Sequence, residues 1–450
     1  MKFNYKNKLN YFFACIASIS FYSFFNYEVL SAVAIGIFTY WLSSLFIRVN
    51  YSLPIKELFL TMYALQFLFG PALAYNGLDE YTNETFRMKV NSEEYFSFII
   101  PVYMAFAIGF NVYCKKYSLK ISRQNINQWV VQNPKTPYIF IGIGFLASLI
   151  SSILPSSLAF VFYLLGSFKY IGLFVLLLSF QTLKLKLMLV IYGLILISSF
   201  QGGMFHDLLT WIIVLCLILA YRYKPSWQYK VAGILGFVLF AIFIQSIKQG
   251  LRAQTWFGNK EASLLLVEDV TADVNKTNSG FLTMDNLGPN FVRINQGWVL
   301  ASAMDHVPYK IGHTHGELLG KYLYSSIIPR FIDDTKLNAG SQEVFNRYSG
   351  HRIEKGTAIG LGLFTDSYVE FGDFGAVFYV FLFGLLYGYV LNQFKQKSSR
   401  YPVLIMFVML VFIYPIRPDC ETQTALGHLL KSIMLITIVF SAFKKHFLLK

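Results

Sequence analysis

The sequence has few charged residues. Only 14% of its 450 residues are Asp, Glu, Lys or Arg, whereas soluble domains carry roughly 25%. Apolar types make up 55% of the chain, and phenylalanine and tyrosine are abundant at 45 and 30 residues. A chain with this composition has too little charge to cover a water-exposed surface. We therefore exclude a soluble fold and expect a protein that is solvated by lipid.

Cysteine is also scarce. The four cysteines lie in or beside apolar segments without CxxC spacing, at Cys15, Cys114, Cys216 and Cys420. This pattern argues against a zinc cluster and a disulfide framework, and it predicts small core residues. The first apolar segment lacks a cleavage site of small residues, so we expect no cleavable signal peptide.

Acidic residues are outnumbered. The chain has 38 Lys and Arg against 24 Asp and Glu, which gives a formal net charge of +14. Such an excess is compatible with nucleic-acid binding, but here the basic residues gather at the ends of apolar segments. That position is typical of membrane proteins, whose cytoplasmic loops are rich in Lys and Arg. We therefore expect contact with membrane lipids and no nucleic-acid partner.

Long apolar segments fill most of the chain. A helix needs roughly 20 mostly apolar residues to cross a bilayer. Twelve candidate spans are found at 9–25, 29–47, 56–75, 95–113, 138–154, 157–180, 185–200, 205–221, 229–247, 369–393, 401–416 and 425–443. The stretch 138–180 can alternatively be one long broken segment, and Gly202 and Gly203 divide the stretch 185–221. The sequence thus predicts an all-α polytopic membrane protein with about twelve transmembrane helices.

The basic residues also orient the predicted spans. If the N-terminus is cytoplasmic, the cytoplasmic segments hold 21 basic residues and one acid, Glu57. The loop 76–94 on the other side instead holds five acids and two basic residues. This asymmetry predicts two cytoplasmic termini in a bacterial inner membrane. It divides the chain into a membrane region of about nine helices (1–247), a large periplasmic loop (248–368) and a membrane region of about three helices (369–450).

The predicted loop 248–368 is too long to lack structure of its own. We expect amphipathic helices near Gly297–His306 and Gly316–Tyr324. The loop is rich in basic and histidine residues, at Lys248, Arg252, Arg293, His306, His313, His315, Arg330, Arg347, His351 and Arg352. Because a guanidinium presents a fork of donors that suits phosphate, such a surface would fit an anionic lipid headgroup such as a pyrophosphate. A solvated domain with scattered charge is the alternative.

Two short patterns in the loop allow more than one interpretation. Lys248 and Arg252 lie four residues apart, so they share a face if the preceding span continues as a helix; ordinary snorkelling is the alternative. In IGHTHGELL, His313, His315 and Glu317 alternate as on a strand and would converge there as metal ligands. However, HxHxE is not HExxH, and a metal needs a closed set of ligands. Histidines that lie at the surface or form hydrogen bonds are therefore favoured.

Ionisable residues also mark the last spans. Glu370 and Asp373 flank the start of the tenth span, where they either cap a helix N-terminus or include a general base. Charged residues inside spans usually face a protein-lined cavity. A polar interior is therefore predicted, although any single member can be a structural salt bridge; its members are Lys169, Asp207, Arg417, His428 and Lys431, with Asp419 beside Arg417. The tenth span also contains four glycines, which are small enough to allow close contact between helices: Gly372, Gly375, Gly384 and Gly388.

In these motifs the chain resembles the Wzy-type O-antigen and repeat-unit polymerases, in particular the enterobacterial-common-antigen branch. The resemblance covers most of the chain as topology and is most specific from Arg293 to Lys431. It is carried by IQSIKQGLR, VRINQGW, IGHTHGELLGKYLYSSIIPRFID, an extended segment with Phe345 and Gly350, AIGLGLFTDSYVEFGDFGAVFYVFLFGLLYG and IRPDCETQTALGHLL. Relatives often carry an arginine after paired glycines in a mid-chain span. This chain instead has His206 in SSFQGGMFHDLLT.

The resemblance implies a glycosyltransferase that needs neither a nucleotide sugar nor an obligatory metal. The donor would be a growing glycan on a polyprenyl pyrophosphate, and the acceptor one repeat unit on the same kind of lipid, with a chain-length regulator and a flippase as partners. Cations would stabilise the leaving pyrophosphate, and the candidates are Lys248, Arg252, Arg293, Arg330 and Arg417. The candidates for the base that takes the hydroxyl proton are Glu370 and, behind it, Asp373, His315 or His206. Trp256, Trp298 and Tyr322 would stack on sugar rings.

Other functions fit the same topology. An O-antigen ligase would transfer finished glycan from polyprenyl pyrophosphate to another acceptor, and it shares the basic external loop. A transporter or flippase for lipid-linked oligosaccharide would be expected to show internal repeats, which we do not find in the sequence, and it would not need a folded loop of this length. A structural scaffold would leave the ionisable residues inside the spans unexplained.

Overall fold

The computed structural model describes residues 2–114, 119, 121–151, 156–180, 185–202, 206–252, 284–328, 332–333, 335–353 and 358–448. The described residues are almost entirely helical, and the β-structure among them is one isolated bridge between Leu53 and Leu119. The first helices are α1 (Lys2–Phe24), α2 (Val29–Arg48), α3 (Ile55–Ala64), a π-helical turn (Leu65–Phe69), α4 (Gly70–Tyr75), α5 (Ser92–Cys114), α6 (Arg123–Gln132), α7 (Thr136–Ser151), α8 (Ser156–Gly166) and α9 (Phe168–Leu178).

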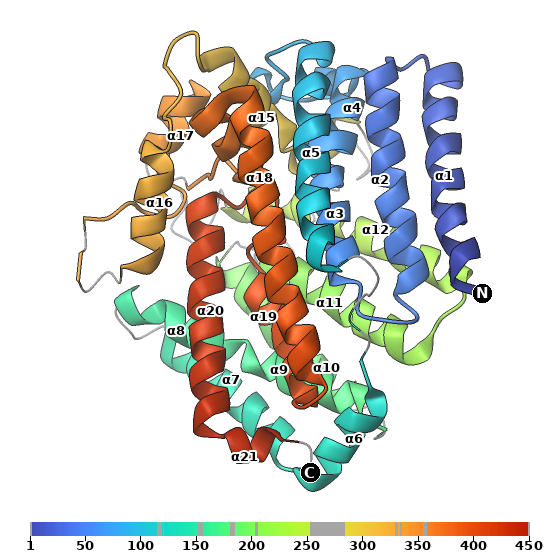
Figure 1. Cartoon of the computed structure of the whole chain (residues 1–450), viewed down its shortest axis with the longest axis vertical. Coiled ribbons are helices and arrows are strands. Elements are labelled where there is room, and N and C mark those ends of the chain that lie inside the picture. Colours follow the sequence, from blue (N-terminus) through green and yellow to red (C-terminus); the bar gives the residue numbers. More distant parts are fainter. Residues whose placement is uncertain are drawn as a thin grey trace.

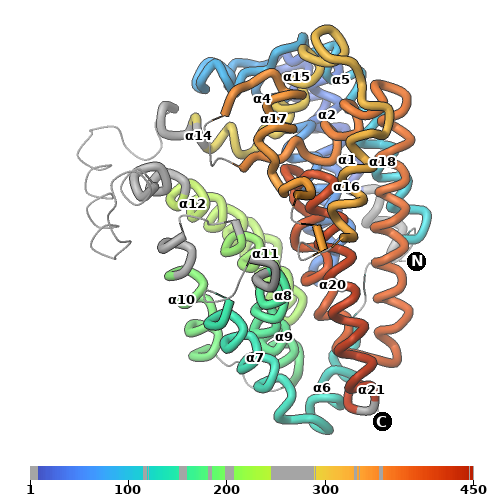
Figure 2. The backbone as a smooth tube through the Cα atoms, turned by 90° about the vertical axis from the view of Figure 1, so that its left-hand side faces the viewer, coloured from blue at the N-terminus to red at the C-terminus, as the bar shows by residue number. Residues whose placement is uncertain are grey.

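The second half continues the helical series. Its helices are α10 (Leu185–Gly202), α11 (His206–Tyr223), α12 (Trp227–Arg252), α14 (Met284–Ile294), α15 (Gly297–His306), α16 (Glu317–Ile327), α17 (Gln342–Ser349), α18 (Leu363–Ser398), α19 (Val408–Phe412), α20 (Thr422–Ala442) and α21 (Lys444–Phe447). In Figure 1, α15 and α17 lie at the upper end of the molecule, and the C-terminus lies at the lower end. Figure 2 shows α10 and α12 on the side away from α18.

Many of these helices are apolar enough for a bilayer. In the described part of the chain, seven helices are long and apolar enough to cross a membrane: Val29–Arg48, Ile55–Tyr75, Ser92–Cys114, Phe160–Leu178, Trp227–Ile244, Leu363–Ser398 and Thr422–Ala442. Four shorter apolar helices are Leu9–Phe24, Thr136–Ser151, Leu185–Ile197 and Pro402–Phe412. The chain is therefore an all-helical membrane protein, as its composition indicates.

Several details of the sequence prediction need correction. Helix α18, which contains the tenth predicted span, starts at Leu363, six residues before the predicted start of that span at 369. The predicted helices at Gly297–His306 and Gly316–Tyr324 are confirmed as α15 and α16. The segment with Phe345, however, is not extended but forms α17, which Ser341 caps by accepting a hydrogen bond from the Val344 N–H and which ends at Gly350 with φ of 72°. A local cap and a left-handed glycine therefore outweigh the predicted extended conformation.

The lone acid predicted on the basic side of the membrane has a structural explanation. Glu57 is fully buried in α3, and its carboxylate lies 2.9 Å from the guanidinium of Arg48 at the end of α2. Lys56, next to it, donates to Asn111 Oδ1 at 2.8 Å. Glu57 thus compensates buried positive charge, which explains why an acid occurs among so many basic residues.

Helices α5 and α18 pack closely along much of their length. A Cβ at Gly109 would lie 2.3 Å from the Phe381 carbonyl oxygen, and one at Gly384 would lie 2.4 Å from that of Phe106. A Cβ at Gly388 would lie 2.7 Å from the Phe110 oxygen. The close contact predicted for Gly384 and Gly388 is confirmed, because only a residue without Cβ lets the backbones approach this far.

We expect Gly384→Ala to destabilise this interface. The added methyl group meets backbone rather than a movable side chain, and overpacking of this kind costs about 1–3 kcal/mol. Thermal unfolding in detergent should therefore begin at a lower temperature. The matched control is Gly142→Ala in α7, where no atom lies within 4 Å of the added Cβ; equal unfolding temperatures for the two variants would contradict the prediction.

Candidate functional site

Helix α18 is broken near its start. Gly372 has φ of 62° and ψ of −158° inside the helix, a region that is essentially restricted to glycine. Such a break interrupts the helical hydrogen bonds to the preceding carbonyl groups. The segment before α16 supplies donors to three of them: His313 Nδ1 lies 3.0 Å from Tyr368 O, Thr314 N lies 3.1 Å from Val369 O, and His315 N lies 2.9 Å from Glu370 O.

The side chain of Glu370 completes this contact in the opposite direction. Its Oε2 accepts hydrogen bonds from Thr314 Oγ1 at 2.6 Å and from the Gly316 N–H at 2.7 Å. Gly316 is the N-cap of α16, so the carboxylate caps that helix, where the dipole favours negative charge. We call His313, Thr314, His315 and Gly316, together with Glu370 and Gly372, the helix-break clamp.

The clamp explains the role of the IGHTHG motif. The predicted strand alternation of His313, His315 and Glu317 is wrong, because His315 has φ of 49° and α16 begins at Glu317. His313 contacts Tyr368, His315 is exposed, and Glu317 pairs with Lys321 at 2.7 Å. Within the described part of the chain, no group of three or more His, Cys, Asp or Glu is arranged to hold a metal ion. The histidines nearest to the break therefore serve the backbone contact.

A second buried carboxylate lies one helical turn before Glu370. Asp366 accepts from the Thr422 N–H at 2.7 Å and from the Tyr322 hydroxyl at 3.1 Å, so it caps the N-terminus of α20. The N-cap residue of that helix, Glu421, accepts from the Gly340 N–H at 2.7 Å, and burial raises the pKa of this carboxyl. The first turns of α18 thus hold the N-termini of both α16 and α20. Tyr322 is fully buried in this network and does not present a face for a sugar.

Arg417 lies in the turn before α20. Its guanidinium forms two hydrogen bonds with the Asp419 carboxylate, at 3.3 and 3.0 Å, and lies 5.3 Å from the centre of the Tyr414 ring. Burial opposes the charge, but the Asp419 carboxylate raises the pKa of Arg417 above its ordinary range. The Arg417 side chain remains 22% exposed and that of Asp419 41% exposed. Arg417 is therefore a permanent cation that an anion can reach.

The predicted polar interior is present around this turn. The Tyr414 ring lies 4.7 Å from that of His428 and 6.1 Å from that of Tyr163, between ring centres. The Tyr163 hydroxyl donates to Asp207 Oδ2 at 3.2 Å. Further cations lie on aromatic rings, with Lys431 at 4.7 Å from Phe160 and Lys169 at 5.4 Å from Tyr170. We call the set Tyr163, Lys169, Asp207, Tyr414, Arg417, Asp419, His428 and Lys431 the charge cluster.

The other predicted site residues are not brought together with the charge cluster by any described contact. Arg293 is exposed in α14, and Asp373 is exposed just after the helix break. Trp298 is 5% exposed, and its ring packs against Phe86, Phe345 and His351. It is therefore a packing residue rather than a sugar platform.

For the remaining predicted site residues, the structure describes either the backbone alone or neither backbone nor side chain. Lys248 and Arg252 lie on the last turns of α12, which continues as one helix beyond the predicted end of the ninth span at 247, so the condition under which the two residues share a face is met. Their side chains lie outside the described part of the structure, as does that of His206 at the start of α11. Arg330 and Trp256 lie outside the described residues altogether.

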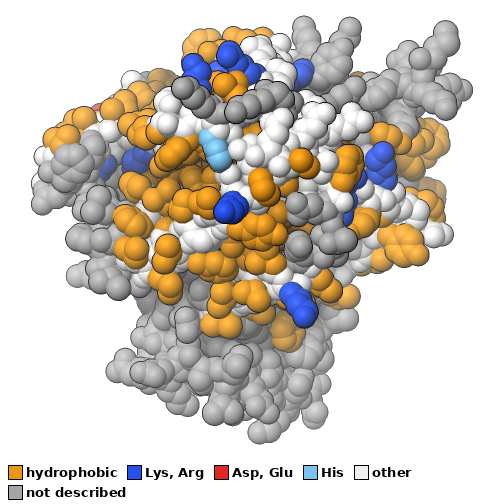
Figure 3. Space-filling model, turned by 90° about the horizontal axis from the view of Figure 1, so that it is seen from below, with side chains coloured by type: hydrophobic (Ala, Val, Ile, Leu, Met, Phe, Trp, Pro, Cys, Tyr) orange, Lys and Arg blue, Asp and Glu red, His pale blue; other side chains and the backbone are white. Residues whose placement is uncertain are grey.

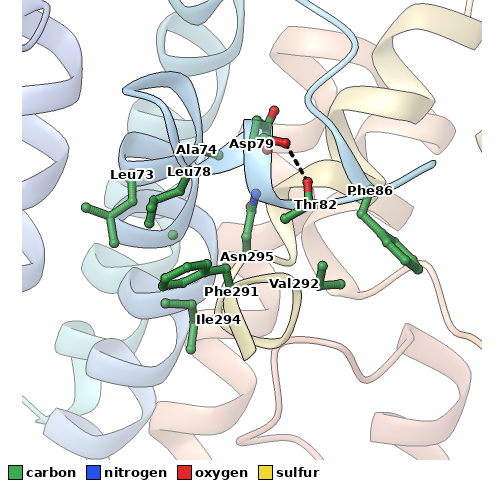
Figure 4. Close-up of a pocket in the computed structure, with 11 residues that line it drawn as sticks. Leu73, Ala74, Leu78, Asp79, Thr82, Phe86, Phe291, Val292, Ile294 and Asn295 are labelled. Atoms are coloured by element: carbon green, nitrogen blue, oxygen red, sulfur yellow. Dashed lines mark hydrogen bonds between the residues drawn. The ribbon is translucent and has the colours of Figure 1, made fainter. Parts of the chain in front are cut away.

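Two hollows of the described structure lie away from the helix-break clamp and the charge cluster. Figure 4 shows a cavity of about 10 Å³ between the loop with Asp79 and Thr82 and helix α14, which is room for about one water molecule. Asp79 accepts from the Met88 N–H at 2.8 Å, and burial raises the pKa of this carboxyl. The other hollow is a groove of about 730 Å³ between α1, α2 and α12, lined mostly by apolar residues. Its lining suits lipid chains better than glycan.

The histidine beside Trp298 gives the folded loop a pH dependence. His351 Nε2 lies 2.9 Å from Ser302 Oγ, and burial lowers the pKa of the imidazole below its ordinary value of 6.5. The folded ring therefore binds protons less readily than the unfolded one, so its contribution to stability is complete above pH 6.5 and is lost as the pH falls through the folded pKa. We expect the unfolding temperature to fall more steeply below pH 6.5 in the wild type than in His351→Gln. Parallel curves would contradict this.

Sequence reasoning missed the residues that join these sites. Thr314 and Gly316 stand 54–56 positions before their partner Glu370, and no local pattern indicates that contact. Tyr163 and Tyr414 were not distinguished from the many tyrosines of the spans. A signal was available at Gly372, because an isolated glycine in a helical pattern weakens the helix locally.

Comparison with known proteins gives one match. A family model with the description "Domain of unknown function (DUF8712)" matches residues 59–401, which include the helix-break clamp and end before Arg417. No curated protein and no solved structure matches the chain.

Proposed function

We propose that this chain, which belongs to the DUF8712 family of unknown function, is a polymerase of lipid-linked oligosaccharide repeat units. It would act on polyprenyl-pyrophosphate glycans and extend a surface polysaccharide. The observation that carries the proposal is the charge cluster, in which Arg417 stays charged and partly exposed at the end of apolar helices. The sequence resemblance to Wzy-type polymerases, which is carried in part by the segment that contains Arg417 and His428, also supports it.

The charge cluster suits the departure of a pyrophosphate. In the proposed reaction, a hydroxyl of the acceptor sugar attacks the anomeric carbon of the donor, the bond to the lipid pyrophosphate breaks, and the hydroxyl proton passes to a base. Negative charge grows on the leaving group, and fixed cations in a water-poor site stabilise it. Arg417 would exchange one partner, Asp419, for the phosphate oxygens, since its planar fork suits both. Lys431 would add a second positive charge.

The base is assigned by exposure. Glu370 is fully buried and its Oε2 already accepts two hydrogen bonds, so we propose that it positions the helix break instead of taking the proton. Asp373 and His315 are exposed beside that break and are the remaining candidates for the base. The cations Lys248, Arg252, Arg293 and Arg330 stay candidates for the wall that receives the lipid pyrophosphate.

We further propose twelve spans with both termini in the cytoplasm of a bacterium and residues 248–368 on the periplasmic face. The seven long and four shorter apolar helices among the described residues support this count, with α11 at the place of another predicted span. Figure 3 shows a few Lys and Arg side chains among hydrophobic ones on the lower face, which is compatible with a cytoplasmic position of that face.

Reconstitution tests the proposal directly. The purified full chain in vesicles that contain lipid-linked repeat units should produce a ladder of longer glycans on a gel. No ladder under conditions in which the protein is folded would contradict the proposal. A deletion strain separates the rivals: single repeat units should accumulate for a polymerase, long lipid-linked polymer for an O-antigen ligase, and cytoplasmic-face precursor for a flippase.

A further inference from the structure

Helix α16 changes character along its length. Its first half carries the exposed pair Glu317 and Lys321, which are 70% and 57% exposed at the side chain. Its second half, YLYSSI, has no charged residue. Nevertheless Leu323 and Ile327 are 42% and 61% exposed there, and Ile332 after the helix is 65% exposed. A water-exposed helix end would not be expected to show this apolar surface.

The apolar end of α16 lies against a membrane span. Ser326 Oγ donates to Gln423 O at 2.9 Å, and the Ser326 Cα lies 3.6 Å from the position of a Cβ at Gly427. Gln423 and Gly427 belong to the first two turns of α20, one of the helices apolar enough to cross a bilayer. Figures 1 and 2 both show α16 beside the N-terminal part of α20. The C-terminal end of α16 is thus fixed relative to the first two turns of α20.

The segment after α16 holds it in this place. Lys336 is buried and its amino group donates to the carbonyl oxygens of Ser325, at 2.7 Å, and Ile328, where a cation also suits the helix C-terminus. Gln423 Nε2 donates to Leu337 O at 2.8 Å. The exposed apolar residues are therefore part of a well-anchored structure.

The lipid-facing side of α20 begins where α16 ends. Leu430, Met434 and Ile438 recur every four residues, and they are 38%, 62% and 63% exposed. This spacing places them on one face of the helix, and in a span such a face contacts lipid chains. Leu430 follows Gly427 by about one turn, so Ile327 extends the same apolar surface upward.

We propose that the face of α16 with Leu323 and Ile327 is inserted into the lipid leaflet at the N-terminal end of α20 and contacts its acyl chains. The partly exposed carboxylate of Asp333, which accepts a hydrogen bond from the Tyr324 hydroxyl at 2.9 Å, lies at the headgroup level. The charged first half stays at the headgroup level, where the Lys321 stem can reach water. Helix α16 thereby joins the folded loop to the membrane surface, and its other end is the N-terminus that Glu370 caps. This inference is independent of the proposed enzymatic function.

Spin labelling tests the insertion. Single cysteines at Ile327, Lys321 and Tyr309 are labelled in the full chain, after Ala replaces the four natural cysteines, and the protein is reconstituted into vesicles of phosphatidylethanolamine and phosphatidylglycerol. The label at Ile327→Cys should collide more often with oxygen than with a water-soluble nickel chelate. The labels at Lys321→Cys and at Tyr309→Cys, which is 77% exposed in a loop, should show the reverse.

Equal accessibility of the Ile327 and Tyr309 labels to the nickel chelate would overturn the proposal. Shielding of the Ile327 label from both reagents would also overturn it, because protein would then cover the surface. A photo-crosslinking residue at position 327 in the otherwise natural chain keeps the test valid if the cysteine-free protein does not fold. It should capture phospholipid, whereas the same residue at position 309 should not; equal capture at both positions again overturns the proposal.

Discussion

Arg417→Ala is expected to lower the rate of glycan elongation about 100- to 1000-fold, the loss found when one donor to a developing negative charge is removed. The protein should remain inserted in the membrane, because Arg417 lies in a turn and is partly exposed. The rate is measured as the length and amount of the product ladder made by reconstituted protein, at equal amounts of inserted chain.

Two further variants separate charge from structure. Arg417→Lys keeps a positive charge but not the planar fork, so it should recover only part of the rate. Asp419→Asn removes the charge of the present partner of the guanidinium and should reduce elongation much less than Arg417→Ala. On the same hypothesis Arg252→Ala should also stop elongation. If both Arg252→Ala and Arg417→Ala produce polymer of wild-type length, these cations do not stabilise the leaving pyrophosphate.

Gly372→Val should destabilise the protein by about 3 kcal/mol, the upper end of the range for a residue held in a sparsely populated backbone region. The backbone at this position has φ of 62°, and a Cβ would lie 3.1 Å from His313 Nε2. The β-branched side chain therefore either strains the break or displaces the segment that clamps it. The unfolding temperature in detergent and protease sensitivity near residues 313–316 measure the effect.

The matched control for Gly372→Val is Gly320→Ala in α16. No atom lies within 4 Å of a Cβ at Gly320, and alanine favours a helix over glycine by about 1 kcal/mol. This variant should be as stable as the wild type or slightly more stable. If Gly372→Val leaves both stability and proteolysis unchanged, the clamp does not hold the helix break.

The helical membrane character of the chain was predictable, because hydropathy acts locally. The apolar segment 95–113 predicts a membrane helix by its length and hydropathy, and α5 forms at this place. Helices α15 and α16 form where the sequence predicted amphipathic helices, but α15 is buried from Gly297 to Met304 and is therefore not amphipathic in its setting. Residues inside spans that carry charge, such as Lys431, indicated a polar interior because lipid does not tolerate them.

The function of the individual acids was not predictable from sequence. Glu370 and Asp366 have the same chemistry whether they face a substrate or a helix N-terminus. The role of each acid is decided by a hydrogen-bond partner that is distant in sequence. The Thr422 N–H, for example, lies 56 positions after Asp366. The helix break at Gly372 also depends on residues distant in sequence. Glycine permits the break, but the segment 313–315 supplies the hydrogen bonds to the carbonyl groups that the break leaves without helical partners.

The order of synthesis gives the helix-break clamp a further consequence. Residues 313–316 leave the ribosome before Glu370, so these donors are made before the carbonyl oxygens of residues 368–370 and the Glu370 carboxylate that accept from them. Those partners arrive only when α18 enters the membrane. Insertion of α18 and closure of the helix-break clamp are therefore coupled in biogenesis, and a chain that ends before residue 370 would lack the Glu370 acceptors of the clamp.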